Sequence, residues 1–186
     1  MTDGPAARAR ARAALEQLVV DVPDFPEPGV VFKDITPVLA DHTAFTDLVA
    51  GLASAGRDAD GTVRVDKVIG MEARGFILAA PVALSLGAGF VPVRKAGKLP
   101  RATHAVSYSL EYGRATLEMH ADAVEAGDRV LLVDDVLATG GTVAATAELV
   151  ARAGATTVGV AVLMELGFLS GRDVVGDLAI TTLLTI

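Results

Sequence analysis

The chain has 186 residues, of which 52% are hydrophobic, and this is enough for one compact, well-filled domain spanning residues 1–186. It contains no cysteine, which excludes disulfides and thiolate chemistry and fits a reducing compartment. A formal net charge of −7 at pH 7 argues against general binding to nucleic acid or to acidic membranes.

The first third of the chain combines two predicted helices with a proline-rich stretch. The helices are expected at Pro5–Val20 and Thr43–Gly56. The stretch between them carries four prolines, which exclude a regular helix or a central strand: Pro23, Pro26, Pro28 and Pro37. We expect irregular, extended backbone there, with N–H and C=O groups free to bind a ligand.

The N-terminus has arginines but no apolar segment of a secretory signal, and no run in the chain approaches the ~18 apolar residues of a membrane span. We therefore expect a cytoplasmic protein.

Short apolar strands then alternate with helices. Strands are predicted at Lys67–Met71, Gly89–Val93, Arg129–Val133, Val158–Met164 and Leu178–Leu184, and helices at Gly75–Leu86 and Thr142–Ala153. Val106–Leu110 and Ala115–Met119 alternate polar and apolar residues, which predicts a hairpin. This order predicts an α/β fold with a central, mostly parallel sheet flanked by helices.

Residues 130–142, VLLVDDVLATGGT, indicate a site for a sugar phosphate. The loop of small residues, Ala138 to Thr142, offers backbone N–H groups, hydroxyls and a helix start to a phosphate. Asp134 and Asp135 are expected to leave the preceding strand at its carboxyl end, where their carboxylates can accept hydrogen bonds from sugar hydroxyls. A strand-end turn with two solvated acids remains the alternative.

Two further segments indicate a second anion site. Arg74 is placed in the first turn of a predicted helix, where the helix dipole disfavours a cation unless an anion is also bound. Arg94, Lys95 and Lys98 form a basic loop on an acidic chain, and this suits a diphosphate. A solvated basic loop is the alternative.

Five segments, in order, resemble one enzyme family over residues 21–171. They are FPEPGVVFKDITPVL, GMEARGF, VPVRKAGKLP, SYSLEYG and VLLVDDVLATGGT. The last resembles the signature of type I phosphoribosyltransferases, and the set resembles the adenine phosphoribosyltransferases. The resemblance implies the type I phosphoribosyltransferase fold, with a small hood (about residues 1–37), a core (about 38–186) and a flexible two-stranded catalytic flap (about 101–119).

The resemblance also implies a reaction. Ribose 5-phosphate is transferred from phosphoribosyl pyrophosphate to N9 of adenine, which gives AMP and pyrophosphate in purine salvage. Mg²⁺ accompanies the substrate, which mainly holds it, and no protein metal site is implied. The family's members are usually homodimers, and no nucleic-acid or membrane partner is expected.

The resemblance assigns roles residue by residue. The 5-phosphate is bound by Ala138, Thr139, Gly140, Gly141 and Thr142, while Asp134 and Asp135 face the ribose. Pyrophosphate is bound by Glu72, Ala73, Arg74, Arg94, Lys95 and Lys98, some of them from a neighbouring subunit. Adenine is bound by the main chain at Val31 and by Phe32, Lys33 and Val136. The flap carries Tyr108, Glu111 and Tyr112, with Glu111 handling the adenine proton.

Two rival functions stay open. A phosphoribosyltransferase for a 6-oxopurine would share the fold but use a different hood. A non-catalytic regulator would sense phosphoribosyl pyrophosphate and bind nucleic acid through a basic surface or an added domain, which the acidic composition disfavours.

Overall fold

The computed structural model describes residues 4–109 and 114–186. Its strands are β1 (Val20–Pro23), β2 (Val31–Asp34), β3 (Lys67–Met71), β4 (Gly89–Lys95), β5 (Thr103–Ser109), β6 (Arg114–His120), β7 (Arg129–Leu137), β8 (Thr156–Glu165) and β9 (Ile180–Thr185). Its α-helices are α1 (Gly4–Leu18), α2 (Thr36–Ala40), α3 (His42–Ala53), α4 (Arg74–Leu86), α5 (Gly141–Arg152) and α6 (Gly171–Val175). Two 3-10 turns are η1 (Ser54–Gly56) and η2 (Gly167–Leu169).

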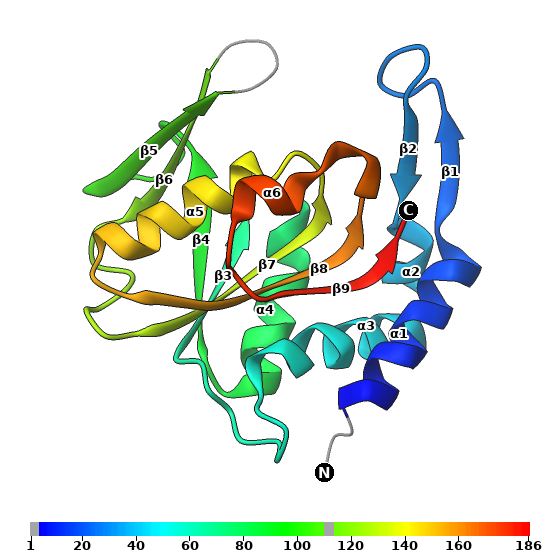
Figure 1. Ribbon diagram of the computed structural model, residues 1–186, viewed down its shortest axis with the longest axis horizontal. Helices are drawn as coiled ribbons and strands as arrows, with labels where there is room; N and C mark the ends of the chain where they lie inside the picture. The colour runs from blue at the N-terminus through cyan, green and yellow to red at the C-terminus, as the bar shows by residue number, and fades with distance from the viewer. Residues whose placement is uncertain (1–3, 110–113) are drawn as a thin grey trace.

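Seven strands form the main sheet in the order β5-β6-β4-β3-β7-β8-β9, and β1 and β2 form a separate hairpin (Figure 1). The strands β4, β3, β7, β8 and β9 run parallel to one another, whereas β6 runs antiparallel to β4 and to β5. The prediction of a mostly parallel α/β sheet is therefore confirmed, and so is the antiparallel pairing of the two strands around residue 110.

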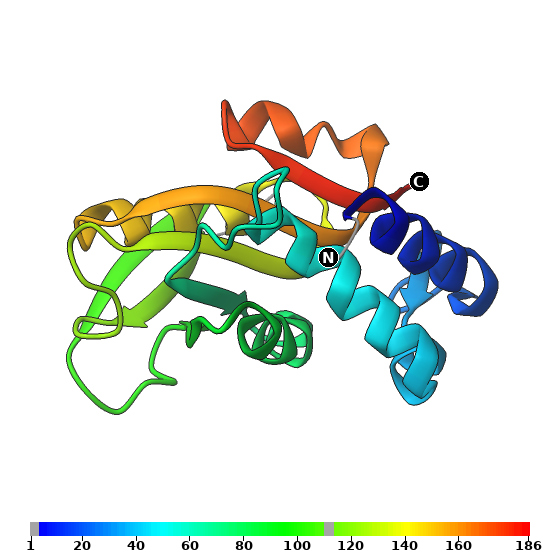
Figure 2. The same cartoon turned by 90° about the horizontal axis from the view of Figure 1, so that it is seen from below.

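Helices cover both faces of the sheet (Figure 2). Along β7, Leu131 and Val133 point to one face and join a buried cluster with residues of α1, α3 and α4. Val130 and Leu132 point to the other face and join a cluster with residues of α5 and α6. This alternation follows from the two-residue period of a strand, and it explains why β7 is apolar on both sides.

Strand β7 is longer than its sequence predicts. The expected end at Val133 is wrong, because β8 also extends and pairs with β7 as far as Leu137 and Glu165. Asp134 and Asp135 therefore lie within the strand and do not follow it. Hydrogen bonds to the partner strand β8 extend β7 beyond Val133. The apolar pattern of β7 alone does not show where β8 pairs with it, so it could not predict this extension.

The proline-rich stretch is more regular than predicted. It forms the antiparallel hairpin β1–β2, with Val20 paired to Asp34 and Pro23 to Val31, and then the short helix α2. Pro26 and Pro28 lie in the connection between the two strands, and Pro37 occupies the first turn of α2, so none of these three blocks a hydrogen bond.

The hairpins β1–β2 and β5–β6 rise at opposite ends of the main sheet, on the side where β7 and β8 end (Figure 1). Within the described part of the chain, no helix is both long enough and apolar enough to cross a membrane.

Candidate active site

The predicted site segments meet at the carboxyl-end edge of the parallel strands. Strand β3 ends at Met71 and is followed by Glu72, Ala73 and the start of α4. Its neighbour β7 ends at Leu137 and is followed by the loop that leads into α5. Ligands of open α/β sheets bind at such an edge, because the strand ends there present loops and helix N-termini.

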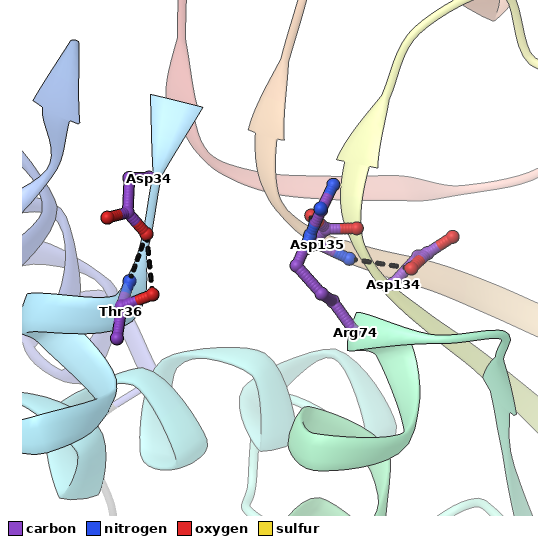
Figure 3. A network of polar contacts seen from close by, with 5 residues as sticks. All are labelled: Asp34, Thr36, Arg74, Asp134 and Asp135. Atoms are coloured by element: carbon purple, nitrogen blue, oxygen red, sulfur yellow. Dashed lines mark hydrogen bonds and ion pairs between the residues drawn. The ribbon is translucent and has the colours of Figure 1, made fainter. Parts of the chain in front are cut away.

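The two neighbouring acids have different surroundings (Figure 3). The Asp135 carboxylate forms an ion pair with Nε of Arg74. Oδ1 of Asp134 accepts a hydrogen bond of 2.9 Å from the backbone N–H of Asp135. Asp134 and Asp135 are consecutive residues of β7, so their side chains leave the strand on opposite sides.

Both acids are buried, with 8% of Asp134 and 7% of Asp135 exposed. Burial raises the pKa of Asp134 well above 3.8, and the negative charge of Asp135 raises it further. A partly desolvated carboxylate interacts strongly with positive charge that forms nearby, because the local dielectric is low.

Arg74 connects three parts of the site. It is the first residue of α4, pairs with Asp135, and places its guanidinium carbon 5.1 Å from the centroid of the Phe32 ring. The predicted need for an anion beside this cation is met here by a carboxylate of the protein itself. With 44% of its side chain exposed, Arg74 remains open to a further anion.

Glu72 joins the two segments that we assigned to pyrophosphate. Its Oε2 accepts hydrogen bonds from Nε of Arg94 at 3.2 Å and from the backbone N–H of Lys95 at 3.0 Å. Arg94 also donates to the carbonyl oxygen of Lys98 at 3.2 Å. Both lysines are exposed. The prediction that β4 ends at Val93 and that Arg94 and Lys95 lie in a loop is wrong, because β4 pairs with β6 through both residues. Glu72 thus orients the end of β4, and Lys95 and Lys98 lie where solvent or a ligand can reach them.

The loop after β7 leads directly into the N-terminus of α5. Gly140 has a φ of 82° and caps α5, which begins at Gly141, one residue earlier than predicted. The first-turn N–H groups of a helix have no carbonyl partner within it and can donate to an anion. The Tyr108 phenol oxygen lies 3.1 Å from Oγ1 of Thr142, which connects β5 to this loop.

The residues predicted to bind adenine lie on two elements. Val31 and Phe32 are on β2, and Val136 lies near the end of β7. The Phe32 ring packs edge-on against Phe25 at 5.2 Å. Lys33 forms an ion pair of 2.6 Å with Asp21 of the neighbouring strand β1, so this lysine is engaged within the hairpin.

Sequence reasoning missed Asp34, which ends β2 across from Arg74 (Figure 3). Its Oδ1 accepts hydrogen bonds from Oγ1 of Thr36 at 2.6 Å and from the Thr36 N–H at 2.9 Å. The Thr36 hydroxyl, followed by the Thr36 amide, lowers the pKa of Asp34. The sequence Asp-Ile-Thr before a helix is a turn signal that could have identified this residue. The predicted flap residues Glu111 and Tyr112 lie outside the described residues.

Two other features bear on ligands. A cavity of about 730 Å³ lies away from this edge, beside α1 and the end of α4, but its Arg8 already donates to Ser54, and its Arg57 to Gly61 and Ser85. Among residues 4–109 and 114–186, no three His, Asp or Glu side chains are grouped to hold a metal ion.

The fold and the site define a phosphoribosyltransferase. Residues 38–173 match the family model described as the phosphoribosyl transferase domain, so the chain belongs to the phosphoribosyltransferase family and has its type I fold. Within this family, adenine phosphoribosyltransferases are among the chain's relatives. The one from Nocardioides sp. is 69% identical over 169 residues, which cover 91% of each chain.

Solved structures of adenine phosphoribosyltransferases are also similar to this chain. The crystal structure of adenine phosphoribosyltransferase from Rhodothermus marinus is 50% identical, with a TM-score of 0.88, and the match covers 96% of this chain and 99% of that one. The Saccharomyces cerevisiae enzyme, complexed with an imino-altritol bisphosphate and adenine, is 38% identical with a TM-score of 0.89, and the match covers 95% and 99%.

Proposed function

We propose that this protein is an adenine phosphoribosyltransferase, which transfers ribose 5-phosphate from phosphoribosyl pyrophosphate to N9 of adenine and releases AMP and pyrophosphate. The observation that carries the proposal is the meeting of the Asp135 carboxylate, the Arg74 guanidinium and the Phe32 ring at one sheet edge. This arrangement offers an anion for the sugar, a cation for the leaving group and a flat apolar surface for the base. The identity to relatives of the same name over most of the chain supports it.

The proposed chemistry is electrostatic and positional. The bond between C1 of the ribose and the pyrophosphate oxygen breaks, and the pyrophosphate keeps the electron pair. Arg74, with Arg94 and Lys95 at the end of β4 and Lys98 just after it, stabilises the charge on the leaving group. Positive charge develops on the ribose near Asp134 and Asp135, and their carboxylates stabilise it. Adenine N9 attacks C1 from the opposite face.

Phosphate binding follows from the loop of residues 138–142. Its backbone N–H groups and the start of α5 hold the 5-phosphate, with the hydroxyls of Thr139 and Thr142 as further donors. Glu72 and Ala73 complete the pyrophosphate site, where Glu72 holds Arg94 in place. Mg²⁺ prefers phosphate oxygens and water, so it would enter with the substrate and supply charge neutralisation of the diphosphate.

Adenine selection is assigned to the hairpin β1–β2. Among the described strands β2 pairs only with β1, so its other edge can offer main-chain donors and acceptors at Val31 to the base. The base lies between Phe32 and Val136. The family resemblance adds Glu111 as the group that takes the N9 proton and Tyr112 beside it, on a flap that closes over the site and excludes water.

Assembly and location complete the proposal. We assign a homodimer on the family's pattern, and a cytoplasmic location on the cysteine-free composition and the intracellular substrates that the reaction needs.

A purine assay tests the function directly. The protein is incubated with Mg²⁺, phosphoribosyl pyrophosphate and adenine, hypoxanthine, guanine or xanthine in turn, and nucleotide formation is followed. We expect AMP from adenine and little product from the 6-oxopurines. A preference for hypoxanthine or guanine would replace the assignment with an oxopurine enzyme. Absence of turnover with every base, together with a gel shift of DNA at modest salt, would favour a regulator.

A further inference from the structure

The segment after β8 packs its backbone directly against the loop after β7. A methyl group added to Gly171 would overlap the carbonyl oxygen of Ala138 and would lie 3.2 Å from the backbone nitrogen of Gly140. A methyl group added to Gly140 would, in turn, overlap the carbonyl oxygen of Gly171. Two main chains in such contact have no flexible side chain between them, so the position of one fixes the position of the other.

The two glycines are required for different reasons. The φ of 82° at Gly140 favours glycine whatever lies nearby. Gly171 has no left-handed φ and begins the short helix α6, so its conformation is open to any residue. Only the close approach to residues 138–140 requires a glycine at position 171.

An ion pair holds Gly171 in this place. Nε and Nη2 of Arg172 donate to the two carboxylate oxygens of Glu165, each at 2.7 Å. Glu165 ends β8, is only 7% exposed, and lies opposite Leu137 in the sheet. The N–H of Leu166 also donates to the carbonyl oxygen of Leu137 at 2.9 Å. A bidentate pair has one defined geometry, so it fixes Arg172, and with it Gly171, relative to the end of β7.

We propose that Glu165, Gly171 and Arg172 are positioning residues for the phosphate loop of residues 138–142. They act through that loop, by holding its backbone N–H groups in the arrangement that binds the 5-phosphate. The inference rests on the proposed function, which gives this loop its ligand. It predicts that a change at these residues weakens the binding of phosphoribosyl pyrophosphate and leaves adenine binding, on β2, unaffected.

The first test is Gly171→Ala, with Gly167→Ala as its matched control. The control adds the same methyl group to the same segment, where it would lie 3.5 Å from Cγ2 of Thr185 and 3.6 Å from the Ile186 carbonyl oxygen, at ordinary contact distance. We expect Gly171→Ala to raise the KM for phosphoribosyl pyrophosphate by about tenfold or more, while the KM for adenine changes by less than about twofold. Gly167→Ala should match the unmodified protein in both constants.

The second test is Arg172→Lys, which keeps the charge but loses the two-pronged contact with Glu165. Its control is Arg12→Lys, since Arg12 forms an exposed pair of 2.8 Å with Glu16 on α1. We expect the same selective rise in KM, of about threefold to tenfold, for Arg172→Lys alone. This variant adds no atom to the backbone contact, so it decides the question if Gly171→Ala fails to fold.

Calorimetric titration with ribose 5-phosphate separates this inference from the proposed function. If the unmodified protein neither binds ribose 5-phosphate nor makes AMP, the proposed function fails. If it does both, and the two variants keep its affinity for ribose 5-phosphate and its KM values, the positioning role is wrong. An equal loss of affinity for both substrates, together with a lowered Tm, would also overturn the positioning role, because general destabilisation of the fold produces that result.

Discussion

The guanidinium carbon of Arg74 lies 5.1 Å from the centroid of the Phe32 ring, and its Nε pairs with Asp135. Phe32 belongs to the separate β1–β2 hairpin, whereas Arg74 and Asp135 belong to α4 and to β7 of the main sheet. One side chain therefore links the part of the site assigned to adenine with the part assigned to the ribose and pyrophosphate.

Arg74→Lys should weaken the binding of both substrates. Lysine keeps the charge but has no planar group that can lie over Phe32 while it pairs with Asp135. We expect kcat/KM to fall by about tenfold or more for adenine and for phosphoribosyl pyrophosphate. Steady-state kinetics with each substrate varied provides the measurement. The control is Arg129→Lys, since Arg129 makes a similar pair with Asp66 at the opposite edge of the sheet. Equal kinetic constants for Arg74→Lys and the unmodified protein would show that Arg74 does not take part in substrate binding.

Asp135→Asn should lower kcat by about a hundredfold, because a neutral amide cannot stabilise positive charge on the ribose. The KM values should change much less than kcat. Steady-state kinetics gives both constants, and single-turnover rates measure the chemical step. An unchanged kcat contradicts the charge-stabilising role.

Asp66→Asn is the matched control for this change. Its side-chain hydrogen bond with Arg129 lowers the pKa of Asp66 from 3.8 to about 2. A carboxylate with a lowered folded pKa stabilises the fold above its unfolded pKa, and this stabilisation is lost as the pH falls through the folded value. Asp66→Asn should therefore reduce the urea midpoint at pH 7 and leave kcat unchanged.

Asp134→Asn should raise stability in a pH-dependent way. Burial raises the pKa of Asp134 above 3.8, so the folded protein binds more protons there than the unfolded chain. As the pH rises from 3.8 through the folded pKa, ionisation of Asp134 destabilises the fold of the unmodified protein. The urea midpoint of Asp134→Asn, relative to the unmodified protein, should therefore increase across this pH range. A constant difference at every pH would show that Asp134 titrates as a solvated carboxyl.

Tyr108→Phe removes a hydroxyl that lies 3.1 Å from Oγ1 of Thr142 and keeps the ring against the core. One hydrogen bond contributes about 1 kcal/mol, so we expect the KM for phosphoribosyl pyrophosphate to rise by about fivefold. Ser107→Ala is the control, because Ser107 bonds Thr116 within the same hairpin at 2.7 Å and does not reach the loop. A similar shift in both variants would mean that the hairpin as a whole, and not the contact with Thr142, is responsible.

Local patterns predicted the elements well where neighbouring residues decide the structure. The strand Lys67–Met71 has the predicted bounds, and residues 138–140 connect β7 to α5, which begins one residue before the predicted start. Apolar runs, glycines and polar turns report such elements because their period and backbone preferences are local. Five segments in order were also enough to indicate the family, which the relatives confirm.

The contacts that arrange the site join residues far apart in the chain. Arg74 pairs with Asp135, which lies 61 positions further along the chain, and Glu72 pairs with Arg94, which lies 22 positions further. The extension of β7 through both acids depended on β8, and the contact of Gly171 with Ala138 depended on two backbones meeting at one edge. The sequence by itself determined most of the helices and strands of the core, the composition of the core and the family, because these follow from local periodicity and from the chemistry of single motifs. Only the tertiary structure decided which charge faces which, because a partner across the sheet leaves no periodic signal in the chain.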